Sequence, residues 1–290
     1  MLEQLFTFWK WPLIACLILP WLMVYLGLHI IRRGIIFVDL ALAQIAALGT
    51  CLSILAGYDV HDWQSYAFSL GFTLMGAVIF TLTRTQEHRV PQEALIGIVY
   101  VVAAAAGIIV LNQGTGGTEE LQRSLVGELL VVSPGEVWQT FGLFVLVGVV
   151  HCVFRKKFLA ITFDPEHAAK QGMAIRWWDF LFYALFGLVV TSFVHIGGVL
   201  LVFTYLIVPA VCGVYLADSM AARLAIGWGV ATVGSIVSLG VSVQANLPIG
   251  ATIVCGLGLL LLLTAIVAAF RKPAVPRGNG RAATSARPPA

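Results

Sequence analysis

Long apolar runs recur along almost the whole chain, and they constrain its fold more than any other feature. A helix needs about 20 mostly apolar residues to cross the hydrocarbon core of a membrane. Of the 290 residues, 60% are hydrophobic and only 11% are charged, which is more apolar surface than a soluble core buries. We therefore predict an all-α polytopic membrane protein with about eight or nine spanning helices. The candidate spans are residues 12–31, 35–56, 65–83, 95–112, 138–154, 179–196, 198–217, 222–243 and 250–270.

The chain divides by composition into two parts. Residues 1–270 carry all the apolar runs and are predicted to form one transmembrane domain. Residues 271–290 (RKPAVPRGNGRAATSARPPA) are basic and rich in Pro, Ala and Gly. Such a segment has too few apolar side chains to form a core, so we predict a disordered cytoplasmic tail.

The basic residues predict the orientation of the chain in the membrane. With nine spans and the N-terminus outside, all but two of the 17 Lys and Arg residues fall on the inner side, leaving Lys10 and Arg123 outside. Inner loops of membrane proteins are rich in Lys and Arg. We therefore expect the N-terminus outside and the C-terminus inside. The two runs that meet at Gly197 and Gly198 are either two crossings or a helix with a re-entrant segment.

Motifs of catalysis and nucleotide binding are absent from the sequence. It contains no G-x-x-x-x-G-K-[ST] loop, no G-x-S-x-G and no H-E-x-x-H. Asp39 is the one acid well inside a predicted span, which argues against paired-carboxylate chemistry. We predict a conduit rather than an enzyme, with its energy supplied by a partner or an ion gradient.

A long inner loop contains a candidate docking helix. In DPEHAAKQG (164–172), Asp164 is a good N-cap and Pro165 suits the first helical turn. Glu166 follows, the small Ala168 permits close approach by another protein, and Gly172 is expected to end the helix. The alternative is an ordinary interfacial helix with no partner.

The inner loop and several other stretches of the chain resemble a known family. The inner loop is similar to the coupling segment of ABC-transporter permeases, and the whole chain resembles the ABC-3 permeases of bacterial zinc, manganese and iron importers. The matching stretches are RRGIIFVD (32–39), SLVGELLVVSPGEVW (124–138), LAITFDPEHAAKQGM (159–173), GGVLLVFTYLIVPAV (197–211) and NLPIGATIV (246–254).

The resemblance implies a function and partners. It implies the permease subunit of an ATP-driven importer of divalent metal in the bacterial plasma membrane, with zinc or manganese foremost and iron as a further candidate. Two permease copies would form the pathway, and a cytosolic ATP-binding subunit would dock on the inner loop and hydrolyse ATP. An extracytoplasmic protein would deliver the metal, which is a substrate, and no cofactor belongs to this chain. The alternatives are a permease for a metal chelate, or a secondary transporter with Asp39 as its ion site.

The candidate transport path begins at Asp39, where many family members have an Asp followed four residues later by a His. Here that later position is Ala43, and Val38 replaces a preceding glycine. Gln44 is about 140° around a helix from Asp39 at 100° per residue, so an undistorted helix cannot present both to one ion. The alternative for Asp39 is a first-turn acid paired with Arg32 or Arg33.

His195 is the remaining candidate ligand. It precedes Gly197 and Gly198, where a helix can unwind and expose carbonyl groups. An imidazole there would compensate for the missing histidine at position 43. The alternative is an interfacial histidine that hydrogen-bonds to the backbone.

Overall fold

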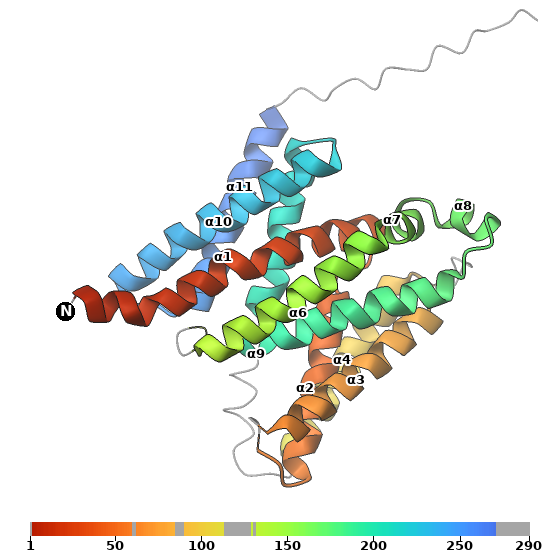
Figure 1. Cartoon of the computed structure of the whole chain (residues 1–290), viewed down its shortest axis with the longest axis horizontal. Helices are drawn as coiled ribbons and strands as arrows, with labels where there is room; N and C mark the ends of the chain where they lie inside the picture. Colours follow the sequence, from red (N-terminus) through yellow and green to blue (C-terminus); the bar gives the residue numbers. More distant parts are fainter. Residues whose placement is uncertain (1, 60–61, 85–89, 113–128, 130–131, 271–290) are drawn as a thin grey trace, which may run out of the picture.

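The computed structural model describes residues 2–59, 62–84, 90–112, 129 and 132–270. The predicted tail at 271–290 lies outside these residues, as does most of the 112–138 loop, so those predictions stay predictions. The described part of the chain is helical and contains no strand. Its helices are α1 (Leu2–Arg33), α2 (Val38–Leu55), α3 (Trp63–Leu82), α4 (Gln92–Leu111), α6 (Pro134–Val153), α7 (Arg155–Phe163), α8 (Pro165–Lys170), α9 (Ile175–Leu216), α10 (Met220–Ala245) and α11 (Ile249–Phe270) (Figure 1).

Eight of the described helices are long and apolar enough to cross a membrane, namely α1, α2, α3, α4, α6, α9, α10 and α11. The all-α, multi-span prediction is therefore confirmed. The structure differs from the nine candidate runs at one place, because the runs 179–196 and 198–217 both belong to α9. Gly198 interrupts that helix with φ +72°, a conformation that glycine adopts without steric cost. The second half of α9 therefore leaves the direction of the first half (Figure 1).

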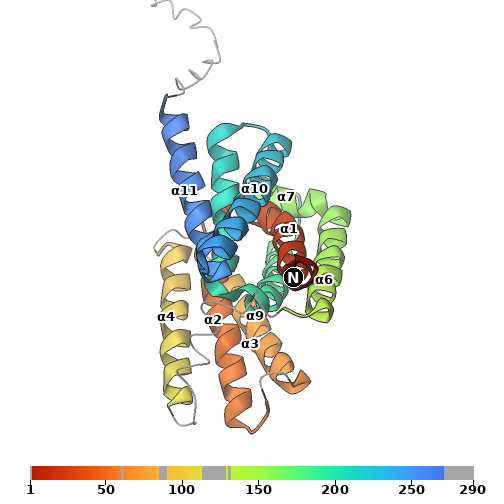
Figure 2. The same ribbon diagram turned by 90° about the vertical axis from the view of Figure 1, so that its left-hand side faces the viewer.

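Helix α9 is the centre of the bundle. It packs against α1, α2, α3, α10 and α11. Figure 2 shows α4 and α11 on one side of the molecule and α6 on the opposite side, with α9 between them. Aromatic side chains of α9 fill the interior, where Phe182, Tyr183, Phe186, Phe193 and Tyr205 are almost fully buried.

Small residues let the helices of this bundle approach closely. At Gly27 of α1, an added Cβ atom would lie 1.9 Å from the backbone oxygen of Leu206 in α9. Close backbone contact of this kind is typical of helices that associate within membranes. The outward faces of α4 and α11 expose large apolar side chains such as Val101 and Leu262, which suits contact with lipid.

Candidate transport and coupling sites

Asp39 lies in the first turn of α2 and is buried, with 1% of its surface exposed. Among the described residues, neither of its carboxylate oxygens has a hydrogen-bond partner. A buried carboxylate without partners is costly, and the positive end of the α2 dipole offsets that cost only in part. The backbone amides of Asp39 and Leu40 lie next to this carboxylate, but no described group completes a hydrogen bond to either of its oxygens.

The alternative reading, in which Asp39 pairs with Arg32 or Arg33, is wrong. Arg33 Nη1 donates to Asp179 Oδ1 at 3.0 Å, and its Nε donates to Thr162 Oγ1 at 3.1 Å. Arg32 lies over the ring of Phe163 at 5.3 Å. Both arginines turn toward α7 and α9 and leave Asp39 without a basic partner in the described part of the chain.

Gln44 is buried on α2, and α2 is continuous from Val38 to Leu55. With no break in the helix, Gln44 stays about 140° around the axis from Asp39. Ala43, which does share the face of Asp39, has no ligand atom in its side chain. Asp39 is therefore the only side chain on that face of the first two turns of α2 that could bind a metal ion.

His195 is exposed and lies beside the start of α3, where its ring centroid is 6.4 Å from that of Tyr66. A hydrogen bond of 2.7 Å between Ser53 and Ser65 places this start of α3 against the end of α2. His195 is thus near the C-terminal end of α2, and Asp39 is in the first turn of that helix of 18 residues, about 27 Å long. The structure does not bring the two candidate ligands together.

Glu93 is a residue that the sequence reasoning missed. It lies in the first turn of α4, and its Oε1 accepts a hydrogen bond of 2.9 Å from the backbone N–H of Phe37, the N-cap residue of α2. Its Oε2 is buried with no partner among the described residues. The predicted span began at residue 95 and left this acid outside it. The available signal was an acid just before an apolar run, where a helix dipole favours it.

A cluster of charged side chains connects the ends of several helices. Asp179 of α9 forms ion pairs with Arg33 of α1 and with Arg84, which follows α3. Arg84 Nη2 also donates to the carbonyl of Ile161 in α7 at 3.4 Å. The guanidinium of Arg33 lies 3.9 Å from the ring centroid of Phe182. This arrangement ties α7 to the helices α1 and α9 of the bundle.

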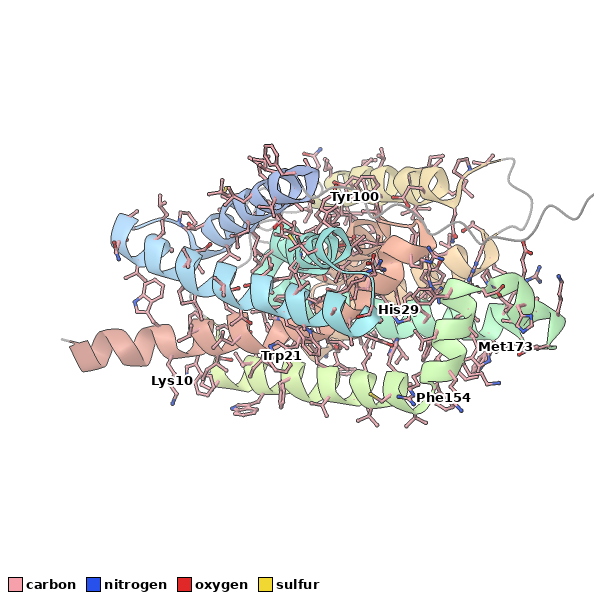
Figure 3. The ribbon with its side chains drawn as sticks, turned by 90° about the horizontal axis from the view of Figure 1, so that it is seen from above. Lys10, Trp21, His29, Tyr100, Phe154 and Met173 are labelled. Atoms are coloured by element: carbon pink, nitrogen blue, oxygen red, sulfur yellow. The ribbon has the colours of Figure 1, made fainter. Side chains whose placement is uncertain are left out.

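Thr162 connects the same cluster to a buried histidine. Its hydroxyl is 2.9 Å from His29 Nδ1 and accepts from Arg33 Nε. His29 is fully buried and packs edge-on against Tyr25, and Figure 3 shows it in the interior of the bundle. His151 likewise packs on Phe158 with a centroid separation of 4.3 Å.

The predicted docking helix is present as α8. Asp164 is its N-cap and accepts from the backbone N–H of His167 at 3.0 Å, with Pro165 in the first turn. Gly172, at φ +74°, follows its C-terminus, so both predicted boundaries are confirmed. Figure 3 shows Phe154 and Met173, which flank α7 and α8, at the end of the molecule away from Lys10.

The surface of α8 differs from the prediction at one residue. Ala168 is only 2% exposed and packs against the protein itself, so it does not present a small face to a partner. Glu166 is exposed on the same helix. The charged side of α8, rather than its alanines, is therefore free for an external contact.

Comparison with known proteins identifies relatives over nearly the whole chain. The manganese import system permease protein ScaB of Streptococcus gordonii is 25% identical over 263 residues, covering 91% of this chain and 92% of the relative. The manganese transport system membrane protein MntC of Listeria innocua is 28% identical over 231 residues, covering 79% of each chain.

Solved structures share the fold. PsaBC from Streptococcus pneumoniae, in complex with Fab, matches with a TM-score of 0.75 at 24% identity, covering 90% of this chain and 92% of that one. An inward-facing metal-chelate type ABC transporter matches with a TM-score of 0.63 at 16% identity, covering 90% and 82%. The model of the ABC 3 transport family matches residues 5–268. This multi-pass membrane protein therefore belongs to the ABC 3 transport family.

Proposed function

We propose that the chain is the permease subunit of an ATP-driven importer of divalent metal ions in the bacterial plasma membrane, with manganese as its first substrate candidate. Membership of the ABC 3 transport family supports the transport role. Relatives that cover about nine-tenths and four-fifths of the chain are named as manganese permeases, which supports the choice of metal over the zinc and iron alternatives.

The observation that carries the proposal is the unsatisfied carboxylate of Asp39 inside a membrane-spanning helix. Ionisable residues within spans are costly and mark ion pathways. Both oxygens of Asp39 are buried and unpartnered in the described structure, so they are free to accept a cation. A carboxylate is also a ligand that hard divalent metals prefer.

The proposal includes three partners. A cytosolic ATP-binding subunit docks on α8 through exposed charges such as Glu166, and ATP hydrolysis takes place on that subunit. The charge cluster at Asp179 holds α7, which precedes α8, against the helices of the bundle. An extracytoplasmic protein delivers the metal, and a second copy of the chain completes the pathway.

Transport in proteoliposomes tests the proposal. The chain, reconstituted with its ATP-binding subunit and its metal-delivery protein, is expected to take up Mn²⁺ with ATP and not with ADP. Asp39→Asn is expected to lower the uptake at least tenfold while the complex still assembles. ATP-independent uptake by the chain alone would establish a secondary transporter instead. Uptake of a metal chelate without uptake of the free ion would show that the substrate is the chelate rather than the free metal ion.

A further inference from the structure

We propose that Asp39 and Glu93 together form an all-oxygen cation site where the N-termini of α2 and α4 meet, and that this site selects manganese over zinc. The inference rests on the proposed function, because it treats the ion as the transported substrate. Its new element is Glu93, which belongs to a different helix from Asp39 and is 54 positions farther along the chain (93 minus 39).

The backbone brings Glu93 to the start of the helix that carries Asp39. Glu93 Oε1 accepts from the N–H of Phe37 at 2.9 Å, and Asp39 is only two residues farther along in the first turn of α2. The negative charge of Glu93 lies within electrostatic range of Asp39. Helices α2 and α4 also pack closely along their length.

Three oxygens at this point have no partner in the described part of the chain. They are Asp39 Oδ1, Asp39 Oδ2 and Glu93 Oε2, and all three are buried. The backbone amides of Asp39 and Leu40 lie next to the Asp39 carboxylate without completing a hydrogen bond to it, and the amide of Phe37 donates to Glu93. The amide of Val38 is bonded to the carbonyl of Ile35 at 3.2 Å.

No basic side chain among the described residues neutralises the two acids. The ion pairs of Arg33 and Arg84 both go to Asp179. Asp39 is buried and Glu93 is partly buried, and two like charges at such a site repel each other unless a cation lies between them. Two carboxylates and three open acceptor oxygens therefore fit a divalent cation better than any other class of ligand.

The ligand chemistry favours a hard metal. Carboxylate, carbonyl and water oxygens suit manganese and magnesium, whereas zinc prefers sites that include imidazole or thiolate. Ala43, on the face of α2 that Asp39 shares, supplies no imidazole. With only two protein side chains, water would complete the coordination shell, and the resulting modest affinity suits an ion that must enter and then leave.

Glu93→Gln separates this role from a purely structural one. The glutamine side-chain carbonyl can still accept from the Phe37 amide, so the cap on α2 is retained while the charge is lost. A matched control is Glu136→Gln. Glu136 is also a first-turn acid, and its Oε2 accepts from the backbone N–H of Ser133 at 2.7 Å in α6.

The experiment measures Mn²⁺ and Zn²⁺ binding to the purified permease–ATPase complex, with the loss of the free Mn²⁺ signal followed by electron paramagnetic resonance. Glu93→Gln is expected to weaken Mn²⁺ binding at least tenfold and to lower the ratio of Mn²⁺ to Zn²⁺ affinity, while Glu136→Gln changes neither. Glu93→Asp, which keeps the charge, is expected to retain more Mn²⁺ binding than Glu93→Gln. The double variant Asp39→Asn/Glu93→Gln should weaken Mn²⁺ binding by no more than about the larger of the two single-variant effects, because both residues bind the same ion.

Wild-type Mn²⁺ affinity in Glu93→Gln, in a complex that melts normally, would overturn the two-carboxylate site. If that variant does not fold, unchanged Mn²⁺ affinity and selectivity in Asp39→Asn, which removes the charge of the other proposed ligand, would overturn it instead. ATP-driven Mn²⁺ uptake by the wild-type complex is measured in parallel. If the wild-type complex takes up Mn²⁺ and Glu93→Gln binds Mn²⁺ normally, only the two-carboxylate site is contradicted. If the wild-type complex takes up no Mn²⁺, the proposed function is contradicted.

Discussion

Arg33 Nη1 donates to Asp179 Oδ1 at 3.0 Å, and this bond joins residues that are 146 positions apart in the sequence. Both side chains are almost fully buried, with exposures of 3% and 2%. Arg84 reaches the same carboxylate oxygen. The single acid Asp179 therefore compensates two guanidinium groups and holds α1 and the end of α3 against the start of α9.

Replacing Asp179 by Asn is expected to destabilise the protein strongly. The substitution leaves the buried Arg33 guanidinium without a counter-charge, and breaking a buried pair in this way typically costs about 3–5 kcal/mol. The melting temperature of the detergent-solubilised protein measures the effect. Asp218→Asn, at an exposed position after α9, serves as the control and should change stability by less than about 0.5 kcal/mol. Equal melting temperatures for the two variants would contradict a structural role for the Asp179 cluster.

Glu166→Arg is expected to abolish association with the ATP-binding subunit and leave the membrane domain folded. Glu166 is exposed on α8, so reversing its charge alters the docking surface without disturbing a buried contact. Co-purification of the two subunits provides the measurement. Lys10→Glu reverses an exposed charge at the other end of the molecule (Figure 3) and should leave the complex intact. Normal co-purification of the Glu166 variant would show that α8 is not the docking element.

Gly27→Ala is expected to lower stability, because the new methyl group would lie 1.9 Å from the backbone oxygen of Leu206. Helices α1 and α9 would have to move apart, and overpacking of this kind typically costs about 1–3 kcal/mol. Gly229→Ala in α10 is the matched control, because nothing lies within 4 Å of an added Cβ there. That control should be neutral or gain up to about 1 kcal/mol from the higher helix propensity of alanine. A thermal melt of both variants checks the difference in sign.

Ala43→His is expected to shift substrate selectivity toward zinc. The imidazole would lie one turn from Asp39 on the same helix face and add the nitrogen ligand that zinc prefers. We expect the ratio of Zn²⁺ to Mn²⁺ uptake to rise about tenfold or more, because changes to the groups that merely support metal ligands already alter metal affinity by about 10–100-fold.

The control for this gain is Ala43→Leu, which adds comparable bulk but no ligand atom at a position that is only 1% exposed. Its melting temperature reports the cost of overpacking, which the histidine variant should share. A selectivity shift in the leucine variant as well would attribute the effect to packing rather than to metal coordination.

Much of the fold follows from local sequence. The apolar runs predict the spanning helices because hydrophobic length is a property of consecutive residues. The boundaries of α8 are also local, since Asp164 caps the amide of His167, three residues away, and Gly172 takes a positive φ beyond the last turn. The pair Gly197–Gly198 marks a break in the apolar run, and the kink lies at Gly198.

The candidate site depends on contacts that local sequence does not encode. Two adjacent arginines before Asp39 made an ion pair the alternative to a cation site, but packing of α1 against α9 and α7 gives Arg33 other partners. Glu93 reaches Phe37 across 56 positions because α2 and α4 pack side by side.

Hydrophobic length, capping residues and glycine conformations act over a few residues, so the sequence alone predicts a multi-span helical membrane protein with a capped helix at 165–170 and an acid at the start of its second span. Which charges meet depends on tertiary packing. It gave Asp179 to Arg33 and Arg84, placed Glu93 near Asp39 and kept His195 away from it, because side chains far apart in the chain meet only where the packing of whole helices brings them together.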